Sequence, residues 1–195
     1  MTSPGRRPST TKAQLSDIAI ELFSAQGFEN TSLDDIAAAA GIARRTLFRY
    51  YPSKNAMVWG EFDERVAEMR THLRATPTDE PLAQSLLSVL VDFNQFDPHD
   101  VSYHRRRMEL LLRVPALQAH SMLMYAEWRH AIAEFVAART GETPDAHRPQ
   151  TMGWLALGVA LAAYEQWLDH EDTNLSDLLT EGMRTLAEQS LISIG

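Results

Sequence analysis

Cysteine is absent from this 195-residue sequence. Its absence excludes a disulfide framework, a thiolate metal site and a thiol nucleophile, and it suits a reducing compartment. Long apolar runs are also absent: none approaches the roughly 20 residues of a membrane-spanning helix, and the amino terminus lacks the apolar segment of a signal peptide. We therefore expect a cytoplasmic protein without a membrane partner.

The sequence also lacks local motifs of catalysis. It contains no glycine-rich phosphate loop, no G-x-S-x-G, no H-E-x-x-H and no obvious pair of carboxylates. His99, Asp100 and His104 lack a distinctive metal-ligand spacing, so we assign no metal and expect no cofactor. The protein is therefore not expected to be an enzyme. A helical enzyme assembled from distant residues, or a helical protein-interaction module, is the alternative interpretation.

Positive charge is scarce but unevenly distributed. The formal net charge is -8, yet residues 1–54 carry seven Lys and Arg against five Asp and Glu, which leaves 11 against 21 for the rest. A basic segment attached to an acidic body is expected where one end of a protein meets a polyanion. The amino-terminal segment is therefore a candidate for binding nucleic acid.

Apolar residues recur at helical spacing along the chain without period-two alternation, which predicts an all-α fold of about nine helices. One long helix is expected from Ser53 to at least Leu73, because apolar residues follow one another there at spacings of three and four. Later helices are expected over residues 80–96, 100–113, 116–139, 149–170 and 175–192. We place the domain boundary after Lys54, with an amino-terminal domain over residues 1–54 and a larger carboxy-terminal domain over residues 55–195.

Residues 33–51 are typical of a helix-turn-helix, a motif that inserts its second helix into the major groove of DNA. Ser32 and Asp35 resemble a capping box at the start of the first helix, and Gly41 suits the turn that ends it. A second helix is expected over residues 43–51. Its inward side would carry Ile42, Leu47 and Tyr51.

The outward side of that second helix is basic. Arginine can donate two hydrogen bonds to guanine or clamp a phosphate, and its charge displaces counterions from DNA. Alternatively, the cluster is only a solvated face on a structural corner. On the first reading, the groove-facing residues are Arg44, Arg45, Thr46, Arg49 and Tyr50. Phosphate contacts are expected from Thr31 and Lys54, and from Arg6, Arg7 and Lys12 in a flexible amino-terminal arm.

The expected helix over residues 149–170 carries no charge from Thr151 to Tyr164. A helix that is apolar on all sides must be covered on all sides. We therefore predict a two-fold homodimer, in which Gly153 and Gly158 allow helices to approach closely. Alternatively, this helix and the next one only fill the core of a monomer. The predicted dimer interface consists of Trp154, Leu157, Leu161, Tyr164, Leu178, Met183 and Leu186.

The stretch "TSLDDIAAAAGIARRTLFRYYPSKN" closely resembles the signature of the TetR family of bacterial transcriptional regulators. "GRRPSTT", "RRTLFRYYPSKN" and "WGEFD" look most like the subgroup associated with mycofactocin gene clusters. The resemblance implies a homodimer with amino-terminal DNA-binding domains and carboxy-terminal domains for dimerisation and an inducer. It implies a ligand-responsive regulator, most simply a repressor that an inducer releases from a palindromic operator.

By position, Thr31 and Lys54 match residues that usually touch phosphate in this family. Arg44, Arg45, Thr46 and Tyr50 match the groove-facing side of the recognition helix. The sequence departs from the family pattern at Ala43 and Arg45, where serine and a small residue are common. Phe48 replaces a tyrosine that often bonds phosphate, and Tyr50 often corresponds to histidine. These departures leave the preferred bases open.

Large flexible or flat side chains are frequent in the carboxy-terminal region, where most of them are expected to form ordinary core. Some would line an inducer cavity, and the basic run Arg105–Arg107 would seat an anionic head group. The alternative is that these arginines pair with acids such as Glu109 or Asp100. A fatty acyl-CoA has the required charged head and apolar tail, and some members of the family respond to such esters. The candidate pocket residues are Phe62, Phe93, Phe96, Arg105, Met108, Met122, Tyr125, Trp128 and Trp154.

Overall fold

The computed structural model describes residues 10–189, with side chains up to residue 187, and every regular element in this range is a helix. The described residues fall into two compact units that divide between Glu61 and Phe62. These findings confirm the all-α class predicted from the sequence. The division lies after α4 (Lys54–Trp59), a little later in the chain than the predicted boundary.

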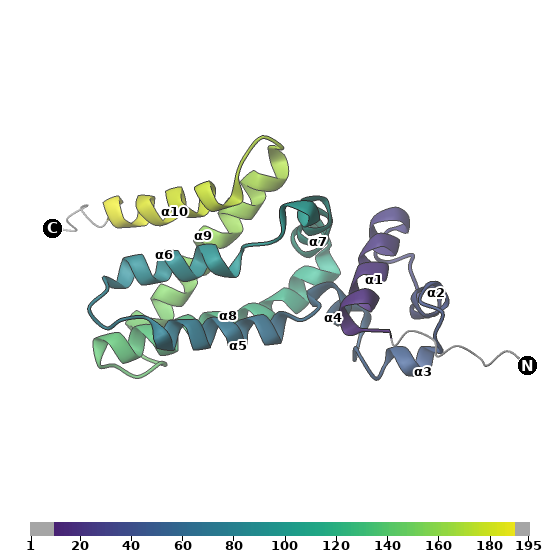
Figure 1. Cartoon of the computed structure of the whole chain (residues 1–195), viewed down its shortest axis with the longest axis horizontal. Helices are drawn as coiled ribbons and strands as arrows, with labels where there is room; N and C mark the ends of the chain where they lie inside the picture. The colour runs from purple at the N-terminus through teal and green to yellow at the C-terminus, as the bar shows by residue number, and fades with distance from the viewer. Residues whose placement is uncertain (1–9, 190–195) are drawn as a thin grey trace, which may run out of the picture. The chain divides into compact units, whose positions relative to one another are not determined.

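The first unit contains α1 (Lys12–Gln26), α2 (Leu33–Ala39), α3 (Arg44–Leu47) and α4 (Figure 1). Hydroxyl side chains cap three of the four helices: those of Thr11, Ser32 and Ser53 each accept a hydrogen bond from a backbone amide in the first turn. The apolar faces meet in a small core. Its members include Leu15, Ala19, Ile20, Phe23, Ile36, Leu47, Tyr51, Met57 and Val58.

The second unit is larger and consists of antiparallel and crossing helices around an apolar interior (Figure 1). The long helices α8 and α9 pack against each other, α5 and α7 pack on α8, and α10 packs on α9 and α6. Gly153 in α9 permits this approach, because a Cβ atom there would lie 2.9 Å from the Arg129 backbone oxygen. The elements are α5 (Phe62–Ala75), α6 (Leu82–Phe93), the 3-10 helix η1 (Pro98–Asp100), α7 (Val101–Arg113), α8 (Pro115–Thr140), α9 (His147–Asp169) and α10 (Leu175–Gln189).

The single long helix predicted from Ser53 is wrong. The chain forms α4 and α5 separately, because Gly60 has φ 61° and ψ −121°, a conformation that ends α4. This break brings the number of α-helices in the described range to ten, compared with the nine expected. The apolar spacing continues across the break, since Trp59, Val66, Met69 and Leu73 are all buried. Spacing alone therefore did not reveal it.

The recognition helix is also shorter than expected. Its α-helical part ends at Leu47, and residues 48–50 continue as a tighter turn, in which Arg49 N donates to Thr46 O and Tyr50 N donates to Leu47 O. The predicted inward residues Leu47 and Tyr51 are buried, with 0% and 2% exposure, and Ile42 is half-buried. The turn therefore keeps the register that the helical pattern predicted.

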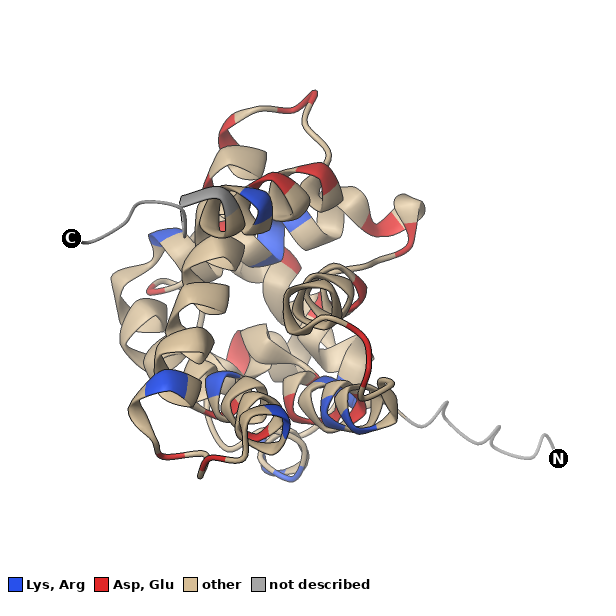
Figure 2. Cartoon of the chain, turned by 90° about the vertical axis from the view of Figure 1, so that its left-hand side faces the viewer, with Lys and Arg blue, Asp and Glu red and all other residues tan. Residues whose placement is uncertain are grey.

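Acidic residues recur along the helices and in the loops of the second unit (Figure 2). Several of them pair with arginines of the same unit, such as Asp169 with Arg113 and Glu142 with Arg148. Acidic residues outnumber arginines in this unit, so its surface is negative overall. The positive charges of α3 belong to the other unit.

Candidate DNA-binding surface and candidate ligand-binding interior

The α2–α3 connection is built by short-range hydrogen bonds. The Ser32 hydroxyl accepts from Asp35 N, and the Asp35 carboxylate accepts from Ser32 N at 2.8 Å and from the Ser32 hydroxyl at 2.6 Å. These bonds stabilise the charged carboxylate and lower the pKa of Asp35. At the other end, Gly41 has φ 64° and Ile42 N donates to Ala37 O at 3.0 Å. The result is a tight turn that sets the direction of α3.

The outward side of α3 and the turn after it carries three exposed arginines: Arg44, Arg45 and Arg49. Arg44 Nη1 donates to Asp34 Oδ2 at 2.9 Å. Its guanidinium carbon lies 5.8 Å from the centre of the Phe48 ring, and that of Arg49 lies 5.4 Å from the centre of the Tyr50 ring. Thr46 and Tyr50 are half-buried beside them. All five predicted groove-facing residues thus lie on one short, basic segment.

Thr31 and Lys54 occupy a different environment. Thr31 is only 1% exposed, and its hydroxyl donates to Gly27 O at 2.9 Å. Lys54 Nζ donates to Phe28 O at 2.6 Å and to Thr31 O at 3.2 Å, and lies 4.2 Å from the centre of the Phe28 ring. Both side chains hold the α1–α2 loop in place. Because the Thr31 side chain is buried, the phosphate contact expected from this residue does not come from its hydroxyl.

The arm residues Arg6 and Arg7 lie outside the described residues. Their contact with DNA therefore stays a prediction.

The interior of the second unit contains two aromatic clusters. In the first, the Phe93 ring lies 5.8 Å from the Phe62 ring and 6.0 Å from that of Trp128, between centroids. In the second, the Phe96 ring stacks on His104 at 4.3 Å and lies 5.6 Å from Trp167. Of the predicted pocket residues, the structure brings Phe62, Phe93 and Trp128 together and places Phe96 in the other cluster.

The remaining apolar pocket candidates are scattered. Met108 is buried and Tyr125 is half-buried, whereas Met122 and Trp154 are 51% and 47% exposed. Trp154 lies on the surface of α9 with the Arg129 guanidinium 3.5 Å from its ring centre. Met122 and Trp154 therefore do not line the interior. Both follow an apolar helical pattern, but the pattern did not indicate which side of the helix is covered.

A buried polar chain links α7, α9 and the end of α6. Tyr164 donates its hydroxyl proton to Asn94 Oδ1 at 2.8 Å, so His104 Nε2, 2.9 Å from the same hydroxyl, acts as a donor. Burial, together with the positive charges of Arg107 and Arg65, lowers the pKa of His104 to about 3. Burial raises the pKa of Tyr164. Both rings are therefore neutral near pH 7. Asn94 was missed in the sequence, where a single asparagine at a helix end resembles an ordinary cap.

Arg105 is bound by backbone carbonyls. Its guanidinium donates to Trp167 O at 2.5 Å and to His170 O and Glu171 O at 3.4 Å, and lies 4.2 Å from the Trp167 ring centre. It therefore binds the carbonyls at the end of α9, as cations do at helix carboxyl ends. Within the part of the chain that the structure describes, Arg105 pairs with no acid, so the ion pair expected as the alternative does not form at this residue. Glu109 pairs with Arg113.

A groove of about 170 Å³ lies between α5 and α6. Its apolar surface comes from Met69, Val89 and Phe93, and Arg65 donates to the carbonyls of Phe93 and Gln95 beside it. His72 Nδ1 lies 3.5 Å from Asp92 Oδ2 across the seam between the two helices. Phe93 connects this groove to the first aromatic cluster. It is the single predicted pocket residue that lines the groove.

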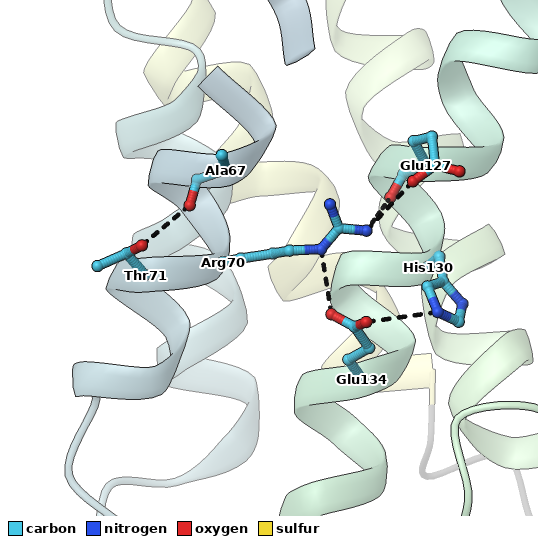
Figure 3. Close-up of polar contacts among 6 residues, drawn as sticks. All are labelled: Ala67, Arg70, Thr71, Glu127, His130 and Glu134. Carbon is cyan, nitrogen blue, oxygen red and sulfur yellow. Dashed lines mark hydrogen bonds and ion pairs between the residues drawn. The ribbon is translucent and has the colours of Figure 1, made fainter. Parts of the chain in front are cut away.

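Helix α5 is attached to α8 by an ion-pair cluster (Figure 3). Arg70 donates through Nε to Glu134 at 3.1 Å and through Nη2 to the Glu127 carboxylate at 3.3 Å. Glu134 also lies 3.4 Å from His130 Nε2. A guanidinium that bonds two carboxylates two turns apart on α8 opposes both sliding and separation of α5.

The outward face of α9 carries apolar side chains in its first half. Trp154 and Leu155 are 47% and 41% exposed, and a Cβ atom on Gly158 would have no atom within 4 Å. The predicted interface residues Leu161, Leu178 and Leu186 are half-buried. Leu157, Tyr164 and Met183 were predicted there wrongly, because each is at most 9% exposed within its own unit and packs inward.

Among residues 10–189, no group of three His, Cys, Asp or Glu side chains is arranged to hold a metal ion. No helix in this range is long and apolar enough to cross a membrane.

Comparison with known proteins agrees with this geometry. The family described as bacterial regulatory proteins, tetR family, matches residues 15–58, and the MftR C-terminal domain matches residues 80–190. MftR of Mycobacterium tuberculosis, named as a candidate mycofactocin biosynthesis transcriptional regulator, is 51% identical over 90% of this chain and 88% of its own length.

Two solved structures have a similar fold. Thermus thermophilus FadR, a TetR-family repressor in complex with lauroyl-CoA, aligns with a TM-score of 0.60 and 21% identity over 95% of this chain and 97% of its own. Bacillus subtilis FadR in complex with stearoyl-CoA aligns with a TM-score of 0.65 and 13% identity over 90% and 97%.

Proposed function

The chain belongs to the TetR family of bacterial transcriptional regulators, and on this premise we propose that it is a dimeric, ligand-responsive repressor of a near-palindromic operator. The observation that carries the proposal is the exposed basic segment Arg44–Tyr50, anchored from below by buried Leu47 and Tyr51. Such a segment presents arginine forks to base edges and phosphates while its backbone stays fixed. The acidic second unit would be repelled by the same DNA.

The DNA-binding proposal is tested by sequence selection with purified protein, followed by affinity measurements at several salt concentrations. We expect a selected sequence with two-fold symmetry and half-sites about one helical turn, ~34 to 36 Å, apart. Affinity should fall steeply with salt, because several phosphates are neutralised. Failure to select any sequence, with binding no better than to random DNA, would contradict the proposal. A helical enzyme or a protein-interaction module would give that result.

The proposed dimer face is the outward side of α9 together with the half-buried leucines of α10. Glycine inside a helix costs about 1 kcal/mol relative to alanine, so a helical glycine needs a packing reason. Gly153 and Gly182 have such a reason within the chain, because a Cβ atom on either would approach a neighbour to 2.9 Å and 2.7 Å. Gly158 has none among the described residues. Close approach of a second copy would supply the reason, and exposed Trp154 and Leu155 lie beside it.

The proposed inducer is a long-chain acyl-CoA or a similar amphipathic ester. The two FadR proteins of related fold are complexed with lauroyl-CoA and stearoyl-CoA. In this chain, the groove between α5 and α6 leads to the cluster of Phe62, Phe93 and Trp128, which offers an apolar site for an acyl chain. Arg65 at the groove is the nearby cation, and it would have to exchange its bonds to the carbonyls of Phe93 and Gln95 for bonds to the head group.

Induction would act through α5, which follows the first unit directly in the chain. We propose that operator binding favours α5 in its place on α8 and that the ligand fits better when α5 has moved. The ligand then weakens operator binding by the same factor by which the operator weakens ligand binding. Isothermal titration with long-chain acyl-CoAs, free fatty acids and CoA tests the ligand class. Heat with acyl-CoAs together with release from the selected operator would support it, and no heat with any acyl-CoA would contradict it.

A further inference from the structure

The arginines of the recognition segment are held in different ways. Arg44 is bound at Nη1 by Asp34, 2.9 Å away, and its guanidinium also lies beside the Phe48 ring. Arg45, the next residue, has no hydrogen bond, ion pair or ring contact within residues 10–189. Asp34 from α2 and Phe48 from the same turn therefore hold the Arg44 guanidinium, whereas the Arg45 side chain can rotate.

Asp34 lies in the first turn of α2, where its charge favours the helix dipole, but it forms no part of the hydrogen-bonded cap. The capping box at the start of α2 is formed by Ser32 and Asp35, and Asp34 lies beside it with its side chain 66% exposed. Exposed ion pairs usually contribute between zero and about 1 kcal/mol to stability. A carboxylate at this place also repels DNA phosphates, which is a cost for any protein that binds DNA. Because Asp34 is present despite this cost, we look for its role in the choice between DNA sequences.

The single bond from Asp34 leaves the Nε and Nη2 atoms of Arg44 without a hydrogen bond in the described part of the chain. This pair of donors matches guanine O6 and N7. An arginine fixed in this way cannot swing to a phosphate without losing both Asp34 and Phe48. It therefore discriminates between bases instead of adding affinity for any duplex.

We infer that Asp34 is a specificity-determining residue, which positions Arg44 for one base pair of each half-site and weakens binding to all other DNA. This inference rests on the proposed DNA-binding function. Asp34 need not touch DNA, since it acts through the guanidinium that it holds. Phe48, at 45% exposure, serves as the second support of the same side chain.

The test compares Asp34→Ala with wild type on the selected operator and on random duplex of equal length. We expect affinity for random DNA to rise, because a negative charge has left the surface. We expect the ratio of operator to random affinity to fall about fivefold or more, which is what one bidentate base contact supplies. Asp17→Ala is the matched control, since it removes an exposed carboxylate from α1 of the same unit. It should leave the ratio unchanged.

A double-mutant cycle separates positioning from simple repulsion. In an Arg44→Ala background, Asp34→Ala should change operator and random affinity by equal factors, because no guanidinium is left to position. An unchanged ratio for Asp34→Ala in the wild-type background, in protein that keeps its helical circular dichroism, would overturn the inference. Failure of wild-type protein to select any operator would instead overturn the proposed function, so the two failures are distinct.

Discussion

Single polar side chains tie the helices of the first unit together at the residue scale. The Ser16 hydroxyl donates to Met57 O at 2.7 Å and the Tyr51 hydroxyl to Lys12 O at 2.9 Å, so α4 and the end of the recognition segment are both attached to α1. Lys54 attaches the start of α4 to the α1–α2 loop through the carbonyls of Phe28 and Thr31. Because these donors are satisfied within the unit, replacing their side chains should mainly lower the stability of the unit.

Replacing Lys54 with methionine should keep its apolar stem but remove both bonds to the loop carbonyls. We expect the first unit to lose about 1–3 kcal/mol of stability, because a charged donor is lost and two carbonyls are left without it. Operator affinity should fall without a change in its salt slope. Arg45→Met is the comparison, since loss of a phosphate contact there would reduce the slope by about 0.9. A flatter slope in Lys54→Met would show that Lys54 itself contacts phosphate.

Protonation of His104 should govern part of the acid sensitivity of the second unit. Its pKa is about 3 in the folded protein, compared with 6.5 for an unperturbed histidine, so between these values the unfolded chain binds more protons. Stability is therefore lost as pH falls below about 6.5. From pH 7 to pH 5 the loss attributable to this residue is about 2 kcal/mol.

His104→Gln should remove that part of the pH dependence while keeping a donor for Tyr164. Urea unfolding at pH 7 and pH 5 measures this pH dependence. The variant should be less stable than wild type at pH 7 but should lose less of its stability on acidification. The exposed histidine His99, changed to glutamine, serves as the control and should follow wild type. An equal acid loss in His104→Gln and wild type would show that His104 is not the responsible group.

At the scale of the elements, the end of α4 depends on one backbone conformation. Gly60 combines φ 61° with ψ −121°, which lies outside the left-handed helical region that asparagine tolerates. Gly141, at the end of α8, has φ 73° and ψ 22° and lies inside that region. The two glycines therefore differ in what can replace them.

Gly60→Asn should lower stability by about 1–3 kcal/mol, because a side chain is forced into a conformation nearly restricted to glycine. Gly141→Asn should cost much less. Thermal and urea unfolding of both variants gives the comparison. Equal tolerance at the two positions would mean that α4 and α5 join without the break at Gly60.

The molecule as a whole is proposed to act as a pair, and here the predicted face can be tested without disturbing the fold. Gly158→Glu adds a charged side chain at a position that has open space within the described chain. The helix should tolerate it, since glutamate favours helix more than glycine does. We expect monomers at micromolar concentration by light scattering and much weaker binding to the two-fold operator.

Gln84→Glu provides the control, because it adds the same charge to an exposed polar position on α6, outside the proposed face. It should remain dimeric. A Gly158→Glu protein that dimerises as well as wild type would place the interface elsewhere.

Features with local causes could be read from the sequence. The all-helical class follows from apolar spacing, and the start of α2 follows from the reciprocal bonds of Ser32 and Asp35. The inward direction of Leu47 and Tyr51 follows from the same spacing. Each of these depends on residues within one or two turns of each other.

Tertiary structure decided what each side chain meets. Lys54 and Arg105 are directed at backbone carbonyls of distant segments, and Leu157, Tyr164 and Met183 turn into their own unit instead of toward a partner. A sequence determines which side chains are apolar or charged and how often they recur. It does not determine which carbonyl lies within 3 Å of a given cation, because that distance depends on how helices far apart in the chain pack.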